Sequence, residues 1–391
     1  MLKTLLAFNN FKDSITAQQV GVTVSNVLTK ALPGINVQSE NVPVSDGGDR
    51  FIETLEESLS LEIIKERVVG PLGEPIESVY GMSRKVPGIA VVEMAKASGL
   101  ELVPEHLRNP LETTTYGTGQ LIKMAIEKGA KRILIGIGGS ATNDAGLGAL
   151  QALGLQIEGE RITSDYFTGR DLNFVTDLHF PTKHLYDDIE FQISCDVKNP
   201  FLGVDGAVNV YSEQKGATQQ WIKSRLEDGM KNIHDLLLKK YNVNVQNIPG
   251  SGAAGGFSAA FLGFTNTKLE SGIKLVSKLL DLENKLKNSD LVFTGEGKLD
   301  SQTEYGKAIS YIMDLCEKYD KPLVCLCGHI EEGVKMRRDN WQAHRMLDVC
   351  DFHTSMNNPT YCLEKLIMDR VYNFPLIKKI AESGLEFPNE K

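Results

Sequence analysis

Hydrophobic positions along the chain switch repeatedly between strand-like runs and helical spacing. An apolar run over Thr4–Phe8 predicts a first strand. The segment Thr16–Gln19 has the pattern of a capping box, and the apolar residues that follow it at helical spacing stop at Pro33 and Gly34. Further strands are expected at 35–44, 132–137, 191–195, 291–294 and 323–327, and further helices at 51–59, 118–128, 218–240, 305–318 and 360–371.

Residues 61–95 differ from this pattern. Three β-type runs, 62–69, 76–84 and 89–94, are separated by turns rich in glycine and proline, which indicates a hairpin-rich insertion. Elsewhere strands alternate with helices, and that order favours a largely parallel sheet covered by helices. The sequence therefore predicts an α/β fold.

Length and charge narrow the possibilities. A chain of 391 residues is more typical of two domains than of one. Its formal net charge of −9 disfavours generic binding to nucleic acid or anionic membranes, and no apolar run approaches the ~18 residues of a membrane helix. The N-terminus has no signal-peptide pattern. We expect a cytoplasmic protein that acts on a small molecule.

Glycines and short polar residues gather where predicted strands give way to helices, which is where parallel sheets usually bind ligands. Glycine lets a backbone approach a phosphate, and a helix N-terminus offers unpaired N–H groups. Four such segments together favour a phosphate-bearing ligand. They are residues 46–49, 136–144, 250–256 and 294–301.

One of these segments also matches a dinucleotide-binding pattern. Gly136–Ala141 fits G-x-G-x-x-[GA], and Glu158 lies near the expected acidic position. Taken alone, this match predicts an NAD-dependent dehydrogenase. However, Asp144 follows directly in the same turn, and carboxylates near phosphates usually indicate Mg²⁺. The chain contains no Walker A sequence.

Nine segments, in order along about 300 residues, resemble the type-1 glycerate kinase family, bacterial enzymes that phosphorylate glycerate with ATP. The blocks at 133–154 and 294–303 are the most specific of the nine. The matching segments are FKDSITA (11–17), SDGGD (45–49), EMAKASGL (93–100), TTTYGTGQLI (113–122), ILIGIGGSATNDAGLGALQALG (133–154), CDVKNPFLG (195–203), QKGA (214–217), PGSGAAGG (249–256) and TGEGKLDSQT (294–303).

The resemblance implies two α/β domains with the active site in the cleft between them. A Rossmann-like domain, residues 1–70 plus 285–391, would be built from both chain ends, and a second α/β domain, residues 71–284, would be inserted between them. The implied cofactors are ATP and Mg²⁺, the implied substrate is glycerate, and the implied product is 2-phosphoglycerate. A homodimer is left open.

Phosphoryl transfer needs a phosphate cradle, a metal ion, a cation and a group that orients the acceptor. The residues predicted to bind the nucleotide are Gly138, Gly139, Ser140, Asn143, Gly255, Gly256, Gly295 and Glu296. The predicted metal ligands are Asp46 and Asp144, and the predicted catalytic residues are Asp196, Asp300 and Lys12, with Asp196 preferred as the base. Lys215 and Lys298 are further candidate cations. The competing interpretations are that these aspartates cap helices or shape turns and that Gly255 and Gly256 only permit tight packing.

The chain departs from the family pattern at several positions. Asn9 stands where the family usually has Asp, Asp49 and Arg50 replace Glu and Gly, and Lys298 replaces a common Arg. An asparagine can hydrogen-bond a hydroxyl but cannot take its proton. These departures keep a non-catalytic sensor of a sugar acid open as an alternative, beside the less favoured dehydrogenase.

Overall fold

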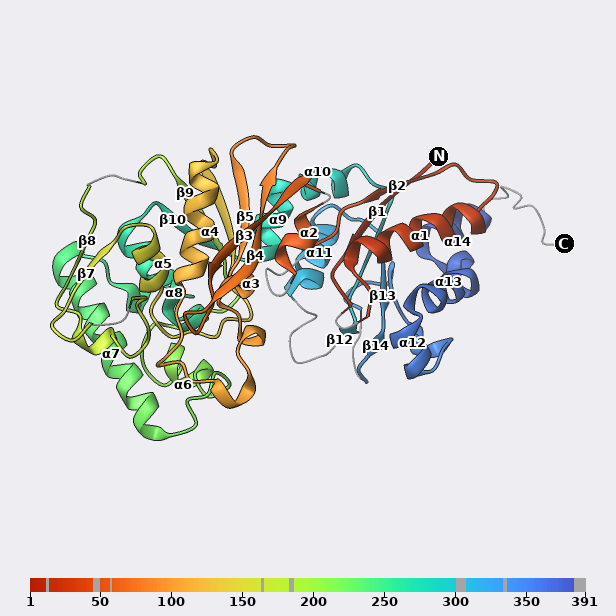
Figure 1. Ribbon diagram of the computed structural model, residues 1–391. Helices are drawn as coiled ribbons and strands as arrows, with labels where there is room; N and C mark the ends of the chain where they lie inside the picture. Colours follow the sequence, from red (N-terminus) through yellow and green to blue (C-terminus); the bar gives the residue numbers. More distant parts are fainter. Residues whose placement is uncertain are drawn as a thin grey trace. The chain divides into compact units, whose positions relative to one another are not determined.

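The computed structural model describes residues 1–11, 14–44, 50–56, 58–162, 165–182, 186–299, 307–332 and 336–382. The chain divides into two compact units (Figure 1, in which the colours follow residue number). The terminal unit comprises Met1–Asp46 and Ile273–Lys391, and the inserted unit comprises Gly47–Gly272. The predicted α/β class, with one parallel-sheet unit built from both chain ends, is confirmed.

The terminal unit is built on a five-stranded parallel sheet in the order β15-β13-β11-β1-β2. Its strands are β1 (Leu2–Phe8), β2 (Val37–Asn41), β11 (Leu291–Gly295), β13 (Leu323–Cys327) and β15 (Trp341–Arg345), with a small pair, β12 (Lys298–Leu299) and β14 (His329–Ile330). Strands β11 and β13 are buried along their whole length, as expected where helices cover both faces of a parallel sheet.

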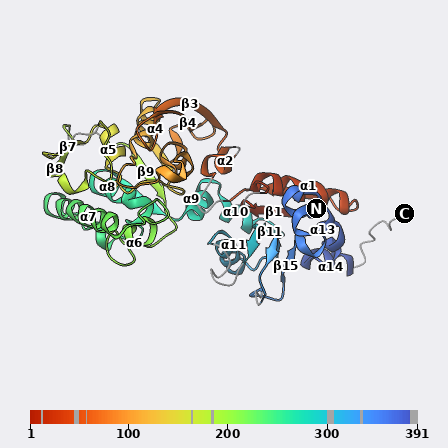
Figure 2. The same ribbon diagram turned by 60° about the horizontal axis from the view of Figure 1, so that its bottom comes forward.

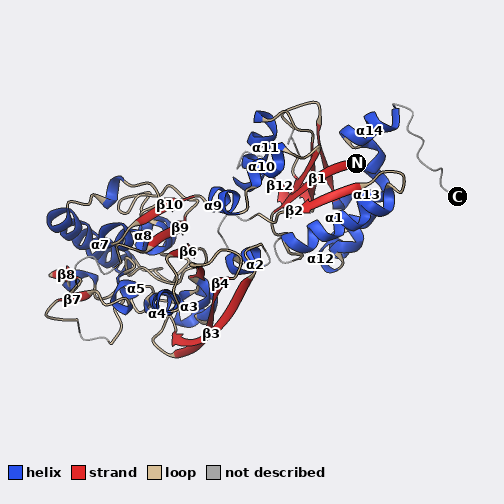
Figure 3. Ribbon diagram, turned by 90° about the horizontal axis from the view of Figure 1, so that it is seen from above, coloured by secondary structure: helices blue, strands red, loops and turns tan. Residues whose placement is uncertain are grey.

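Helices of this unit lie on both sides of the sheet (Figure 3). They are α1 (Ala17–Ala31), α9 (Gly272–Leu279), α10 (Leu282–Lys287), α11 (Lys307–Lys318), α12 (Phe352–Asn357), α13 (Pro359–Arg370) and α14 (Pro375–Glu382). Helix α1 starts with the predicted capping box, in which Thr16 and Gln19 bond each other's backbone N–H. Helices α1 and α13 pack against one face, where Leu6 and Phe293 join the same core (Figure 2).

The order of the strands reverses at β1. The chain moves from β1 through α1 to β2 on one side, whereas β11, β13 and β15 follow in turn on the other. Such a reversal leaves a crevice outside the carboxyl ends of the two central strands, here β1 and β11, and crevices of this kind usually bind ligands.

The inserted unit has a six-stranded sheet in the order β10-β9-β6-β5-β4-β3. The first four strands are parallel, and β4 and β3 are antiparallel additions. The strands are β3 (Leu61–Val69), β4 (Pro75–Ser83), β5 (Ile89–Glu93), β6 (Arg132–Gly136), β9 (Glu190–Ser194) and β10 (Thr267–Glu270), with a separate pair, β7 (Gln156–Glu158) and β8 (Asp177–His179). The helices are α2 (Phe51–Glu56), α3 (Ala95–Ser98), α4 (Tyr116–Glu127), α5 (Leu147–Ala152), α6 (Ala207–Tyr211), α7 (Gln220–Tyr241) and α8 (Ala253–Phe264).

The structural division between the units differs from the boundaries expected at 70/71 and 284/285. Strand β3 pairs with β4 along its whole length, from Leu61 opposite Ser83 to Val69 opposite Pro75. Residues 61–69 therefore belong to the inserted unit, and the chain crosses between the units at 46/47 and again at 272/273. In the part of the chain that the structure describes, no helix has the length and apolar character needed to span a membrane.

Candidate active site

The four parallel strands of the inserted unit end level with one another. Glu93 at the end of β5 lies opposite Gly136 at the end of β6, and Gly136 lies opposite Ser194 at the end of β9. The next strand, β10, ends with Glu270 opposite Ser194. The segments that follow these strands therefore emerge at one edge of the sheet, which is the usual ligand-binding edge.

The segment after β6, residues 137–146, forms what we call the cradle loop. Helix α5 begins only at Leu147, nine residues after Gly138, so Gly138 and Gly139 do not open a helix directly as expected. The loop is anchored instead by backbone bonds from Leu100 N to Gly139 O (2.7 Å) and from Ala141 N to Ser98 O (2.9 Å). A dinucleotide-binding motif needs a helix directly after its glycines, so the context of that motif is absent here.

Gly138 and Gly139 form the accessible part of the cradle loop. Gly139 is exposed and has a φ of 66°, a left-handed conformation that glycine adopts at little cost, and Gly138 is half-buried. The next residues, from Ser140 to Asp144, are buried. Only the glycine backbone is therefore presented to a ligand, while the polar side chains of the loop lie beneath it.

Asp144 is completely buried and ties the cradle loop to two helices. Its Oδ2 accepts hydrogen bonds from Thr115 N (2.8 Å) and Thr115 Oγ1 (2.7 Å), and its Oδ1 accepts one from Gly146 N (3.1 Å). The same threonine hydroxyl receives the N–H of Ala149 in α5. Burial raises the pKa of Asp144, against the opposing effect of these bonds. Because both oxygens serve protein donors, the geometry favours a structural role over the predicted binding of Mg²⁺.

Lys215 lies beneath the same loop and is only 2% exposed. Its ammonium donates to Ser140 Oγ (3.0 Å) and to the carbonyl of Thr142 (2.7 Å). Burial lowers the pKa of Lys215 to about 7, although the negative charge of Asp144 acts in the opposite direction. The sequence marked Lys215 only as one of three candidate cations, and the structure places it as a buried cation directly behind the loop.

The glycine beside Lys215 explains how the lysine becomes buried. Gly216 has a φ of 106°, and a Cβ at this position would lie 1.9 Å from the carbonyl oxygen of Arg108. Only glycine permits this approach, which packs the 212–217 turn against the 105–110 segment.

Two neighbouring side chains in the cradle loop have unsatisfied polar atoms. Asn143 is completely buried, and neither its Oδ1 nor its Nδ2 has a hydrogen-bond partner among the described residues; the same holds for Thr142 Oγ1. Buried polar atoms are rarely left unpaired, because each one costs about 1–3 kcal/mol. Because these atoms lie beneath the loop, they are suited to bound water.

Gly255 and Gly256 support the cradle loop from behind. A Cβ on Gly255 would lie 2.0 Å from Thr142 O, and the Gly255 carbonyl accepts a hydrogen bond from Ala145 N at 3.2 Å. Gly256 packs in the same way against Phe201. Both glycines are buried, so the geometry supports tight packing at these positions, and their predicted binding of the nucleotide stays a prediction.

Asp196 follows β9 at the same sheet edge and is half-buried. Its Oδ2 accepts a hydrogen bond at 3.3 Å from the N–H of Gly272, the first residue of α9. The carboxylate therefore lies at a helix N-terminus, where negative charge is stabilised. This contact is compatible with either a capping role or the predicted role as catalytic base.

Glu93 is a buried carboxylate that the sequence analysis missed. It ends the apolar strand β5, is 3% exposed and accepts hydrogen bonds at 3.2 Å from the N–H groups of Arg50 and Ile52 at the start of α2. Burial raises its pKa. The available signal was an acidic residue directly after four apolar ones, at the end of a strand.

The remaining predicted residues divide into two groups. Gly295 ends β11 in the terminal unit, where a Cβ would lie 1.7 Å from Leu326 O, and Glu296 follows it. Lys12, Asp46 and Asp300 lie outside the described residues.

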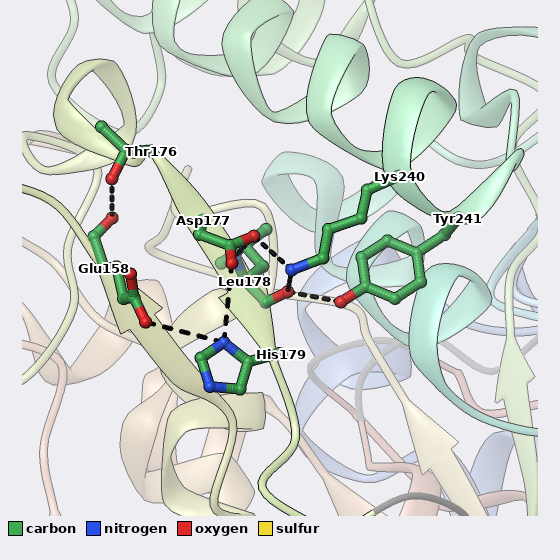
Figure 4. Close-up of polar contacts among 7 residues, drawn as sticks. All are labelled: Glu158, Thr176, Asp177, Leu178, His179, Lys240 and Tyr241. Atoms are coloured by element: carbon green, nitrogen blue, oxygen red, sulfur yellow. Dashed lines mark hydrogen bonds and ion pairs between the residues drawn. The ribbon is translucent and has the colours of Figure 1, made fainter.

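Figure 4 shows where Glu158, the acidic residue of the dinucleotide pattern, is found. It faces Asp177 and His179 across β7 and β8, with ligand atoms within 4.8 Å of one another. Asp177 is already hydrogen-bonded to Lys240, and this contact lowers the pKa of Asp177. The group is best described as a surface network of charges in which Lys240 pairs with Asp177, and His179 Nδ1 lies 3.9 Å from Glu158 Oε1 and 3.8 Å from Asp177 Oδ2.

Comparison with known proteins agrees with this geometry. The sequence profile described as the glycerate kinase family matches residues 4–373. Glycerate 2-kinase of Escherichia coli K12 is 37% identical over 334 residues, covering 85% of this chain and 87% of the relative. Glycerate kinase of Halalkalibacterium halodurans is also 37% identical over 334 residues, covering 84% and 86%. A crystal structure from Salmonella typhimurium LT2, assigned as glycerate kinase 2, is 31% identical with a TM-score of 0.84 over 98% of this chain and 99% of that one.

The chain belongs to the glycerate kinase family. The resemblance drawn from the sequence motifs is therefore confirmed. Within this family member, the structure brings the cradle loop, Lys215 and Asp196 into one unit, and it places Gly295 and Glu296 in the other.

The lowered pKa of Lys215 gives this glycerate kinase family member a specific dependence of stability on pH. Below about pH 7 the lysine is protonated in both the folded and unfolded states. Above that pH the folded state releases the proton, while the unfolded chain holds it up to the ordinary lysine pKa of 10.5. Stability rises with pH wherever the unfolded state binds more protons. The unfolding free energy of the wild type should therefore increase relative to that of Lys215→Met between about pH 7 and pH 10.

Chemical denaturation of both proteins at several pH values measures the two unfolding free energies. Because the two proteins share all their other titratable groups, the contributions of those groups cancel in the difference. Lys128→Met, at an exposed lysine of the same unit, is the matched control. The lowered pKa would be contradicted if the difference in unfolding free energy between the wild type and Lys215→Met stayed constant from pH 6 to pH 10.

Proposed function

We propose that this chain transfers the terminal phosphoryl group of ATP to glycerate and releases 2-phosphoglycerate and ADP. Membership of the glycerate kinase family over residues 4–373 carries the proposal. The curated relatives that match nearly the whole chain include one named glycerate 2-kinase, which supports the 2-hydroxyl as the acceptor.

The cradle loop is suited to holding the phosphate end of the nucleotide. Its accessible backbone at Gly138 and Gly139 leaves room for a phosphate group to approach closely. The Lys215 ammonium lies just behind the loop, 3.0 Å from Ser140 Oγ. Phosphoryl transfer depends mainly on positioning and on neutralising negative charge. A nearby phosphate favours the charged form of a lysine, so binding would oppose the effect of burial and keep Lys215 protonated at neutral pH.

Mg²⁺, when bound, would offset the negative charge of the phosphates. Asp144 is buried beneath the loop and both of its oxygens accept hydrogen bonds inside the protein, and its predicted binding of Mg²⁺ stays a prediction. The other predicted ligand, Asp46, and the acidic Asp300 lie outside the described residues. The use of Mg²⁺ therefore stays a prediction.

Asp196 is the carboxylate best suited to receive the proton of the glycerate hydroxyl. It lies at the ligand-binding edge of the sheet and is half-buried. Its bond to the Gly272 N–H uses one oxygen and fixes the orientation of the carboxylate. Asn9, at the position where the family usually has Asp, cannot perform this step.

The proposal is tested by measuring ADP release with Mg²⁺, ATP and a panel of small hydroxy acids. We expect turnover with D-glycerate and 2-phosphoglycerate as the main product by NMR. Turnover with another acid alone would show that Asn9 or Arg50 has shifted the specificity. Binding of a sugar acid without turnover would favour a sensor, and tight binding of NADH would favour a dehydrogenase.

Replacing Asp196 by Asn should separate catalysis from helix capping. Asparagine keeps an acceptor for the Gly272 N–H but cannot take a proton, so kcat should fall by roughly 10²–10⁴ with an unchanged melting temperature. Asp196→Ala removes the cap as well and should also lower the melting temperature. Near-normal turnover of Asp196→Asn would assign this residue to capping alone.

Replacing Gly139 by Val should abolish turnover while the protein remains folded, because a branched side chain would occupy the space in which the backbone meets phosphate. Gly154→Val is the matched control: Gly154 also has a positive φ, 99°, and a Cβ there has no neighbour within 4 Å. Equal loss of activity and of stability in both variants would indicate that backbone strain, and not ligand contact, explains the effect.

A further inference from the structure

A pocket of about 400 Å³ opens in the terminal unit at the carboxyl edge of its sheet. Four parallel strands each contribute residues from just beyond their ends: Asn9 after β1, Glu296 after β11, Gly328 and His329 after β13, and Met346 after β15. Figure 1 shows β12, β14 and α12 at the same end of this sheet. The pocket therefore lies at the point where the strand order reverses, between β1 and β11.

The wall of the pocket is largely apolar and includes an unusual aromatic residue. Phe11 and Met346 are buried at 2% and 1% exposure, and Met356 lies half-buried beside them. Phe352, the first residue of α12, lines the pocket yet is 69% exposed. A large exposed aromatic side chain at the rim of a cavity gains most from stacking on a flat ligand.

The charged groups in the pocket disfavour a small acid. Lys298 lines the pocket, but its ammonium forms an ion pair at 3.6 Å with Glu331, which lies outside the lining, and Glu296 places a carboxylate in the lining itself. An anionic three-carbon acid would be repelled by the Glu296 carboxylate, and it is too small and too polar to gain from contact with the apolar wall. The volume is also in the range of ~300–1,000 Å³ that is typical of drug-sized ligands.

His329 supplies a polar group for recognition. Its Nδ1 is buried and has no hydrogen-bond partner among the described residues, while its backbone N–H is fixed on Gly297 O at 3.0 Å. An imidazole nitrogen can donate to or accept from the edge of a heterocyclic base. The side chain of Asn9 is fixed at the pocket by the Asn10 N–H, which donates to its oxygen at 2.8 Å.

We propose that this pocket binds the adenine ring of the nucleotide, stacked on Phe352 and hydrogen-bonded by His329. The proposal rests on the proposed function, which requires ATP, and extends it by separating the site of the base from that of the acceptor. Glu296 then lies beside the nucleoside, in the segment where the sequence predicted contact with the nucleotide.

The test compares Phe352→Ala with Tyr361→Ala in the full-length protein. Both side chains are exposed aromatics of the terminal unit, but only Phe352 lines the pocket. Adenosine, which has no phosphates, is titrated by calorimetry. Its affinity should fall at least about 5-fold in Phe352→Ala, the lower end of what loss of aromatic stacking on a base costs, and should be unchanged in Tyr361→Ala. Phe352→Tyr should restore it.

Steady-state kinetics provide the second measurement. In Phe352→Ala the KM for ATP should rise by a similar factor while the KM for glycerate stays constant. A rise in the KM for glycerate alone would make this the acceptor pocket, and equal adenosine binding by Phe352→Ala and the wild type would also overturn the proposal. If the wild type shows no turnover of glycerate but binds adenosine through Phe352, the assignment of the acceptor fails and the nucleoside pocket stands.

Discussion

Two buried groups of opposite charge, the Asp144 carboxylate and the Lys215 ammonium, set the conformation of the cradle loop. Burial is the largest influence on the pKa of each: it raises that of Asp144 and lowers that of Lys215 to about 7. Neither group is satisfied by the other alone, since Asp144 is bonded to Thr115 and Gly146, and Lys215 to Ser140 and Thr142. Removing one partner of such an arrangement leaves an uncompensated charge, which is far more costly than losing one surface ion pair.

In both units the carboxyl edge of the parallel strands is suited to ligand binding, but the residues at the two edges favour different ligands. In the inserted unit the edge of the parallel sheet carries glycines, buried hydroxyls and a lysine, which suits phosphate. In the terminal unit the corresponding edge carries Phe352, Met346 and the Nδ1 of His329, to which no described residue bonds, and this edge suits a flat, weakly polar group. Parallel strands supply the common edge, and the residues just beyond their ends determine what can bind there.

The elements with a clear local signal could be predicted from the sequence. The capping box at Thr16 and the apolar runs of β6 and β11 depend on neighbours a few residues away, and the structure has all three. The family motifs also pointed to the cradle loop. The long loop between β6 and α5 was not predicted, because it depends on backbone hydrogen bonds to Ser98 and Leu100, which belong to a segment distant in the sequence.

Other features depend on contacts between distant segments and so had no local signal. Lys215 is buried because Gly216 packs on Arg108, more than a hundred residues earlier in the chain. Gly255 packs on the backbone of Thr142, a contact that its glycine-rich segment did not indicate. Phe352 lies outside every motif, and its significance appears only when four strand ends are seen to converge beside it.

The discontinuous terminal unit has a consequence for how the protein is made. The chain of the inserted unit is continuous, so this unit can fold as soon as it has left the ribosome, as domains generally do during synthesis. Strand β1 is synthesised first but occupies the middle of its sheet, where Thr294 of β11 bonds to Ala7 from 287 residues away. Until β11 emerges, one edge of this mostly apolar strand has no partner. Nascent chains halted before residue 291 should therefore expose β1 to chaperones while the inserted unit is already folded.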